Sequence, residues 1–271
     1  MPIEAMVWNS TIVDHLSPAM RKRILDCASW RDGMIKADGF KGGRVAVLLL
    51  DKPIHLPDGR FLTAVELKGV VYNMARNAQL PPRDALYRVF TLPYITSELF
   101  ISMRKNPTRQ GGSSFKNARN EYRLLNSLNE GSEPLTQDYG IGYGLYQEYR
   151  DDEKRFGFLV RGVVDPYQSR VWEIFLTGHG EEFLSRKVNM DGEAFQDIRA
   201  LAEEYHELYV MLGKNLRRLH GAGYFHAFPH LGNVYFDPAD DARLLFHDFE
   251  TSRIIRHFPL HHRVGYCLVD L

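Results

Sequence analysis

One long amphipathic helix, predicted over residues 197–219, constrains the fold of this chain more than any other segment. Its apolar side chains recur every three or four residues and form one wide face: Ile198, Leu201, Ala202, Tyr205, Leu208, Tyr209, Leu212, Leu216 and Leu219. A face this wide has to pack against other elements of a core. Gly221 and Gly223 follow directly and end the helix, because glycine adopts the left-handed conformation that closes a helix C-terminus.

Strands are expected where short runs rich in Val, Leu and Phe lie between turn residues. These runs occupy residues 45–50, 61–70, 155–164, 169–176, 234–236 and 243–247. Asp58-Gly59 lies between the first two runs and is a strong hairpin signal.

Two further helices and one irregular insertion complete the list of expected elements. The spacing of apolar residues predicts helices over 17–30 and 115–128, and a serine is available to cap the second. Residues 71–112 hold several prolines between short apolar pieces, and we expect an insertion with one or two short helices there. We interpret the His-rich segment near the C-terminus as a solvated basic tail.

The order of these elements favours an α+β fold. Strands come first, one helix and more strands follow, and the long helix precedes the last two strands, so the two kinds of element are segregated. We expect two lobes. Residues 1–165 would form a β-rich lobe with an N-terminal extension, and residues 166–271 a short helical lobe.

Charge and cysteine content narrow the class of protein. The chain has 271 residues, with 34 basic and 34 acidic side chains. This balance argues against a general nucleic-acid or membrane-surface binder, since both need a basic excess. The longest apolar runs have strand length, far below a membrane span. Two cysteines, Cys27 and Cys267, and an N-terminus without a signal-peptide pattern lead us to expect a cytoplasmic protein.

The residues that carry chemistry gather directly after the long helix. His226 lies in a loop, Asn233 follows seven residues later, and Asp248 lies fifteen residues beyond it, past the predicted strand pair. An amide oxygen and a carboxylate at neighbouring strand ends suit a hard cation such as Mg²⁺. Asn and Asp are also common turn residues, but the surrounding His, Gly and long helix favour the metal site.

This segment resembles the catalytic segment of the protein-kinase-like superfamily, and its sequence is similar to that of the aminoglycoside-phosphotransferase-like branch. That branch reads His-Gly-Asp-Leu-His-Pro-Gly-Asn, where this chain reads His226-Ala-Phe228-Pro-His230-Leu-Gly-Asn233. Asp248-Phe-Glu matches the metal-binding Asp-Phe-Gly/Glu element. The resemblance implies a two-lobed kinase-like fold that uses ATP and Mg²⁺, with Asn233 and Asp248 as the metal ligands.

The catalytic aspartate of the family falls at Phe228, which cannot accept a proton. Loss of a general base usually slows a reaction by about 10²- to 10⁴-fold, and phosphoryl transfer depends mostly on positioning and charge. Two interpretations of His230 remain open: a substitute proton acceptor, since histidine titrates near neutrality, or a residue that holds the loop. His226 is expected to shape the loop.

The resemblance also implies a phosphate-binding lysine on a strand and a glutamate on the helix that follows. Lys68, at the end of the predicted strand 61–70, would contact the phosphates, and Glu121 would orient it. A glycine-rich turn before the first strands is the candidate phosphate cradle; its residues are Gly39, Gly42 and Gly43.

Two short stretches resemble selenoprotein O, a kinase-fold protein adenylyltransferase. They are Glu-Leu-Lys-Gly around Lys68 and Ser-Ser-x5-Asn-Glu-Tyr around Glu121. That family also lacks the usual loop aspartate, but it keeps an aspartate just before the metal-binding asparagine, where this chain has Gly232.

These observations predict an atypical kinase-fold transferase that uses ATP and Mg²⁺. It would move a phosphoryl or an adenylyl group to a protein, peptide or small-molecule acceptor. The alternative, motivated by Phe228, is an inactive pseudokinase that binds nucleotide or serves as a scaffold. The sequence leaves the acceptor and the oligomeric state open.

Overall fold

The computed structural model of the chain describes most of its residues. The described ranges are 2–29, 36–41, 45–70, 72–74, 77–79, 87–95, 101–109, 112–130, 134–151, 154–176, 198–237 and 240–271. All structural statements below concern these ranges.

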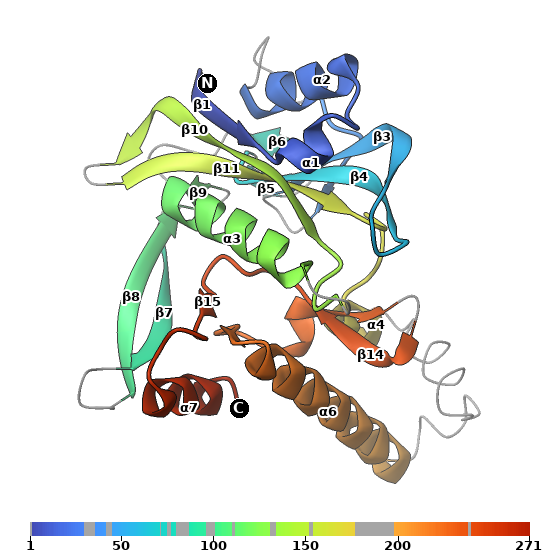
Figure 1. Cartoon of the computed structure of the whole chain (residues 1–271), viewed down its shortest axis with the longest axis vertical. Coiled ribbons are helices and arrows are strands. Elements are labelled where there is room, and N and C mark those ends of the chain that lie inside the picture. The colour runs from blue at the N-terminus through green and yellow to red at the C-terminus, as the bar shows by residue number, and fades with distance from the viewer. Residues whose placement is uncertain are drawn as a thin grey trace.

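A seven-stranded antiparallel sheet forms the upper part of the molecule in Figure 1. Its strands are β1 (Ile3–Trp8), β2 (Gly39–Lys41), β3 (Val45–His55), β4 (Phe61–Lys68), β9 (Ser113–Ser114), β10 (Tyr139–Asp151) and β11 (Lys154–Val163). The spatial order is β1-β10-β11-β4-β3-β2, and β9 pairs with β11. The pairing of β4 with β11 therefore joins an early segment of the chain to a later one at the centre of the sheet.

Six α-helices lie within the described ranges. They are α1 (Ser10–Val13), α2 (Pro18–Ser29), α3 (Phe115–Leu128), α4 (Val171–Leu176), α6 (Ile198–Gly221) and α7 (Leu260–Val269). The predicted helices over 17–30, 115–128 and 197–219 are thereby confirmed as α2, α3 and α6. The expectation of an α+β fold is also confirmed.

Helix α3 lies between the large sheet and the C-terminal elements (Figure 1). It begins where the sequence predicts, because the Ser114 side chain accepts a hydrogen bond from the backbone N–H of Asn117 at 3.1 Å. Its apolar residues recur at helical spacing and are buried: Ala118, Leu124, Leu125 and Leu128. Glu121 lies among them and is buried as well.

Two hydrophobic clusters make up most of the core. The first joins the sheet to α1 and α2 and includes the fully buried Ile24, Leu67 and Phe158. The second joins α3 and α6 to short strands that follow α6, and it includes Leu159 of β11. Helix α3 and Leu159 belong to the predicted segment 1–165, so this cluster spans the expected boundary.

The expectation of short helices in the insertion 71–112 was wrong for its described residues, which form strands. They are β5 (Tyr72–Met74) paired with β6 (Asn77–Gln79), and β7 (Tyr87–Ile95) paired with β8 (Ile101–Arg109). The segment 87–95 is rich in aromatic and β-branched residues, which favour strands. Pro93 and Pro107 are tolerated because a two-stranded ribbon has an outer edge on each strand.

The predicted strand over 169–176 was also wrong, because Val171–Leu176 is helix α4. Its start is set by a cap rather than by propensity: the backbone N–H of Arg170 donates to the Glu173 carboxylate at 2.8 Å. The His-rich segment expected as a solvated tail includes a two-residue strand, β15 (Arg253–Ile254), paired with β12 (Tyr224–Phe225), and helix α7. The predicted strands over 234–236 and 243–247 form the pair β13 (Val234–Asp237) and β14 (Asp240–Phe246).

Two glycines with positive φ lie at the ends of β4. Gly59, in the predicted hairpin turn, has φ 85°, and a Cβ there would meet nothing within 4 Å. Gly69, directly after Lys68, has φ 90°, and a Cβ there would lie 2.7 Å from the Cβ of Ser113. Gly69 is therefore required for two reasons, its backbone conformation and the close approach of β9.

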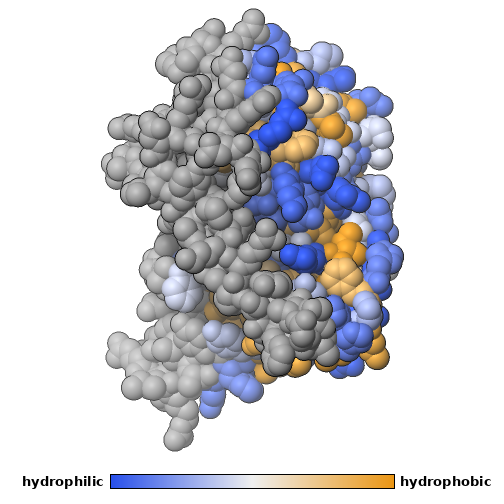
Figure 2. All heavy atoms as spheres, turned by 90° about the vertical axis from the view of Figure 1, so that its left-hand side faces the viewer, coloured by the Kyte–Doolittle hydropathy of each residue, from blue (hydrophilic) through white to orange (hydrophobic). Residues whose placement is uncertain are grey.

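The surface of the described part is mixed. Figure 2 shows hydrophilic and hydrophobic residues interspersed over the coloured part of one face. Among the residues that the structure describes, none of the helices is both long enough and apolar enough to cross a membrane.

Candidate functional site

A buried lysine lies at the centre of the candidate site. Lys68 ends β4, and only 2% of its surface is exposed. Its Nζ lies 2.8 Å from Oε2 of Glu121, which projects from α3 although 53 residues separate the two in sequence. The structure thus brings together the lysine and the glutamate that the sequence suggested as partners.

Two more carboxylates reach the same ammonium group. Lys68 Nζ contacts the carboxylate of Asp248 and lies 3.2 Å from Oε2 of Glu250. Carboxylate oxygens of Glu121, Asp248 and Glu250 all lie within 4.8 Å of one another. Sequence reasoning matched Glu250 to a motif but gave it no role.

The electrostatics of this cluster favour additional positive charge. Burial raises the pKa of Glu121, the charge of Lys68 lowers it, and the neighbouring Asp248 and Glu250 raise it again. Burial is the largest cause of the resulting raised pKa. Independently of it, three carboxylates share the one ammonium group of Lys68. A group of carboxylate oxygens in such an arrangement can bind a cation or an ammonium group, and here Lys68 takes that place.

Asn233 and Asp248 lie at the same end of the β13–β14 pair. Asn233 ends a 3₁₀ turn, η3 (Leu231–Asn233), just before β13, and Asp248 follows β14. The backbone N–H of His247 donates to the Asn233 carbonyl at 2.9 Å, which ties the two strand ends together. The Asn233 side-chain nitrogen donates to the Phe228 carbonyl at 3.0 Å, so its oxygen is the atom suited to bind a cation.

Asp248 has an unusual backbone. Its φ is 63°, in the left-handed region that residues other than glycine rarely adopt. Such a conformation persists only where surrounding contacts hold it, and it is enriched at functional sites.

His226 shapes the loop, as the sequence suggested. It is fully buried, its Nε2 donates to the His247 carbonyl at 2.9 Å, and its Nδ1 accepts from the Phe228 N–H at 3.2 Å. Burial lowers the pKa of His226, so the ring is neutral. Both ring nitrogens therefore serve the loop.

Asp270 also holds this loop, and sequence reasoning gave it no role. Its carboxylate accepts from the backbone N–H groups of His226 at 2.9 Å and Ala227 at 2.8 Å, and it lies 2.8 Å from Nε2 of His220. These contacts hold Ala227 at φ 80°. The sequence carries no signal for this role, because two of the three partners are backbone groups.

His230 is better placed to hold the loop than to accept a proton. Its Nδ1 accepts from the Gly232 N–H at 3.0 Å, so the proton of the neutral ring belongs on Nε2. That nitrogen lies 3.3 Å from the Asn233 side-chain nitrogen, a contact between two donors and not a hydrogen bond in this tautomer. Burial, together with the charge of Arg170, lowers the pKa of His230. Phe228 packs against a small apolar cluster formed by Phe225, Ala227, Ile255 and Tyr266.

A second group of buried charges adjoins Lys68, and sequence reasoning missed it. Arg161, on β11, lies opposite Glu66 of β4, and its Nη2 donates to Glu66 Oε2 at 2.6 Å. Its Nη1 lies 3.4 Å from Oε1 of Glu121 and 3.5 Å from Oδ2 of Asp138. Burial would raise the pKa of Glu66, but the charges of Arg161 and Lys41 together outweigh it and the pKa is lowered. Glu66 is thus ionised and paired.

Lys41 connects this group to β13. Its Nζ lies 3.3 Å from Oε1 of Glu66 and 3.3 Å from the hydroxyl of Tyr235. Of the candidate glycines, Gly39 begins β2, where a Cβ would make only an ordinary contact with Val47. Gly42 and Gly43 lie outside the described residues, so the suggested phosphate cradle stays a prediction.

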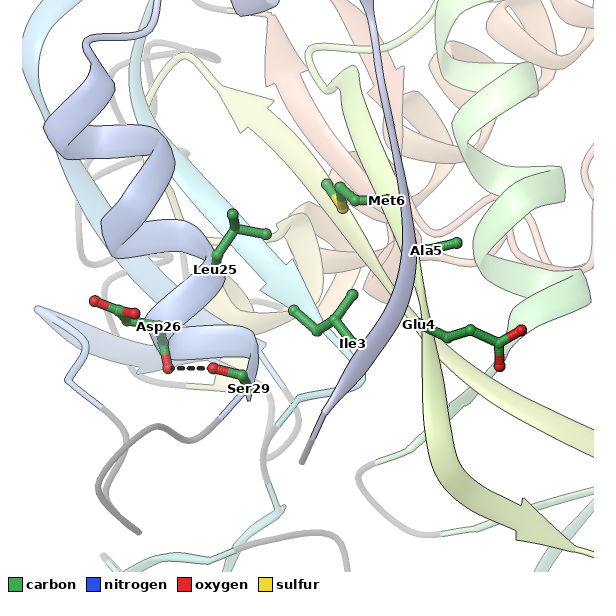
Figure 3. A pocket seen from close by; sticks show the side chains of 7 residues that line it. All are labelled: Ile3, Glu4, Ala5, Met6, Leu25, Asp26 and Ser29. Carbon is green, nitrogen blue, oxygen red and sulfur yellow. Dashed lines mark hydrogen bonds between the residues drawn. The ribbon is translucent and has the colours of Figure 1, made fainter.

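A separate pocket of about 370 Å³ lies between β1 and α2 (Figure 3). In Figure 3, the side chains of Ile3 and Met6 point toward Leu25, and Glu4 points away. The pocket shares no lining residue with the cluster around Lys68.

Comparisons with known proteins give no match to this sequence, either among protein-family models or among curated proteins.

Proposed function

We propose that this chain is an atypical protein-kinase-like transferase that binds ATP with Mg²⁺ between two lobes, residues 1–165 and 166–271. It moves a phosphoryl or adenylyl group to a protein, peptide or small-molecule acceptor. The observation that carries the proposal is that Lys68 Nζ contacts Glu121, 2.8 Å away, and also Asp248. A strand lysine, a helix glutamate and a metal-binding aspartate are the parts that a kinase-like site must unite.

The topology around these residues supports the proposal. Lys68 ends a strand in the middle of an antiparallel sheet, and Glu121 projects from the helix packed against that sheet. Asn233 and Asp248 flank a separate strand pair beyond the long helix α6. In this proposal the sheet forms the nucleotide lobe, and α6 with β13 and β14 forms the second lobe.

The residues present fit a magnesium ion. Asp248, Glu250 and Asn233 offer carboxylate and amide oxygens, which are the ligands that Mg²⁺ prefers. Three carboxylates surround the single ammonium group of Lys68 at this point. Asp248, Glu250 and Asn233 would hold the ion, which would supply positive charge to offset that of the phosphates.

Lys68 and a metal would compete for the Asp248 carboxylate. The present contact between Lys68 and Asp248 has to loosen when the oxygens of Asp248 turn to a cation. Lys68 can then point its ammonium group at phosphate oxygens while Glu121 keeps it in place. In this proposal Glu121 is the permanent partner of Lys68 and Asp248 the exchangeable one.

One observation favours the second candidate, a nucleotide-binding pseudokinase. The position of the loop base is taken by Phe228, which packs in an apolar cluster, and the Nδ1 lone pair of His230 is used by the Gly232 N–H. If transfer occurs, it relies on positioning and charge rather than on a loop carboxylate.

Isothermal titration of ATP with and without Mg²⁺ tests the nucleotide-binding claim. We expect wild-type protein to bind ATP more tightly with Mg²⁺, and Asp248→Asn to lose that gain. Asp26→Asn is the matched control, because this carboxylate lies on α2, away from Lys68. Wild-type protein that binds no ATP in the presence of Mg²⁺ would refute the proposal.

Intact-mass measurement then separates the two candidate functions. The protein is incubated with Mg-ATP and casein or a peptide library as acceptor. A phosphate-sized or AMP-sized gain on the acceptor or on the protein itself indicates a transferase. Binding without any mass gain indicates the pseudokinase.

A further inference from the structure

His247 lies in the buried charge group next to Asp248 and has no part in the proposal above. Only 2% of its surface is exposed. Its ring meets Tyr235 edge-on, with ring centroids 5.1 Å apart. A buried histidine can be a satisfied core residue and nothing more, so its contacts decide the question.

The hydrogen bonds of the imidazole define its tautomer. Its Nε2 lies 3.2 Å from Nη2 of Arg161 and 3.3 Å from Nη2 of Arg170. Guanidinium groups only donate, so Nε2 accepts and the proton is on Nδ1. Nδ1–H then donates to Oδ2 of Asp138 at 2.6 Å. The neutral ring thus accepts from two guanidinium groups at Nε2 and donates to one carboxylate at Nδ1, and Arg161 also lies 3.5 Å from that same carboxylate.

The backbone of His247 is fixed on both sides. Its N–H donates to the Asn233 carbonyl at 2.9 Å, and its carbonyl accepts from Nε2 of His226 at 2.9 Å. Asp248, with φ 63°, is the next residue. The backbone that leads into Asp248 is therefore tied both to Asn233 and to His226.

The two arginines extend these contacts to the rest of the site. Arg161 also reaches Glu121, the partner of Lys68, at 3.4 Å. Arg170 donates to the carbonyl of Gly232, directly before Asn233, at 2.9 Å. The His247 ring therefore contacts two arginines, one that reaches the partner of Lys68 and one that reaches the residue before Asn233. Asp248 is the next residue in the chain.

We infer that His247 is a positioning residue: through Arg161, Arg170 and Asp138, it holds Asp248 and Asn233 in the geometry that binds a divalent cation opposite Lys68. This inference rests on the proposed function. The inference goes beyond the proposed function because it makes the magnesium affinity of the site depend on a residue that touches neither metal nor nucleotide. Residues that orient metal ligands from behind typically change metal affinity by about 10- to 100-fold when replaced.

Two substitutions separate positioning from packing. His247→Gln keeps an acceptor for the arginines and a donor for Asp138. His247→Phe keeps the ring and its packing against Tyr235 but loses both hydrogen-bonding functions. If His247 only fills the core, Phe should be the milder replacement. If it positions Asp248, Gln should be the milder one.

The measurement is the ATP affinity with and without Mg²⁺, by isothermal titration, for wild type and both variants. We expect His247→Phe to lose the magnesium-dependent gain by about tenfold or more, with affinity for metal-free ATP little changed. We expect His247→Gln to retain most of the gain. A folded His247→Phe protein with the wild-type magnesium dependence would overturn the inference.

Two outcomes need separate treatment. If wild-type protein binds no Mg-ATP, the proposed function fails and the inference falls with it. If the Phe variant does not fold, Arg170→Met replaces it, because Arg170 is only half-buried and lies at the rim of the group. That variant should also weaken the magnesium-dependent gain, and an unchanged gain would refute the role assigned to His247.

Discussion

The ammonium group of Lys68 lies 2.8 Å from the carboxylate of Glu121, and both side chains are almost completely buried. A buried charge is tolerated only when it is paired, because removal from water is expensive. This ion pair thus joins the sheet to α3, and removal of either partner alone would leave the other charge buried without it. This mutual dependence underlies the first prediction.

Lys68→Met should destabilise the protein by about 3–5 kcal/mol, since it leaves Glu121 buried without its main partner. The double variant Lys68→Met/Glu121→Leu should recover part of that loss, because it removes both charges. Urea denaturation monitored by circular dichroism provides the free energies of unfolding. A double variant no more stable than Lys68→Met would contradict the pairing.

Gly69→Ala should be more damaging than Gly59→Ala, although both glycines have positive φ. At Gly59 only the backbone conformation is unfavourable, which costs about 1–2 kcal/mol. At Gly69 the new methyl group also meets Ser113, so we expect about 2–5 kcal/mol in total. Equal losses in thermal and urea unfolding would show that β9 can move away freely.

Mild acid should destabilise the protein, because folding holds two buried histidines neutral. Burial lowers the pKa of His226, and burial together with the charge of Arg161 lowers that of His247 to about 4. The unfolded chain binds these protons near the ordinary pKa of about 6.5, so it gains protons first as the pH falls. Stability should be complete above about pH 6.5 and should decline toward about pH 4.

Urea midpoints measured from pH 8 to pH 4 check this expectation. His247→Gln provides the control, because it removes one of the histidines whose pKa is lowered and should flatten the decline. A midpoint that stays constant down to pH 5 would contradict the assignment of two neutral buried histidines.

Asp270→Ala should loosen the loop that carries His226, because the backbone N–H groups of His226 and Ala227 lose their acceptor. Each buried unsatisfied donor costs about 1–3 kcal/mol. Asp270→Asn keeps an acceptor oxygen and should lose less. Hydrogen exchange at these two amides measures the effect, and Asp14→Ala, at an exposed position, serves as the control. Unchanged protection in Asp270→Ala would refute the role.

The helices could be predicted where local pattern decides them. The periodic faces of α2, α3 and α6 indicated these helices from the sequence. Helix α4 was missed because residues 171–176 have strand-like composition, and its cap depends on one contact, from Arg170 to Glu173. The β7–β8 hairpin was missed because its prolines suggested breaks, whereas a two-stranded ribbon tolerates them at its outer edges.

Site residues could be predicted from the sequence only where they belong to a recognisable motif. Lys68 and Glu121 were indicated by short sequence motifs, and their side chains are in contact in the structure. His247 meets Arg161 and Asp138 across sequence separations of 86 and 109 residues. A local sequence pattern cannot indicate contacts between residues so far apart in sequence. This part of the site can be identified only from the three-dimensional structure.

The long sequence separations within the site have a consequence for the nascent chain. Lys68 is 53 residues from Glu121 but 180 residues from Asp248. At a synthesis rate of about 5–20 residues per second, Glu121 follows Lys68 within about 3–11 s and Asp248 within about 9–36 s. Glu121 is therefore the first of these counter-charges to emerge after Lys68, and the N-terminal sheet can bury its lysine before the rest of the site has been made.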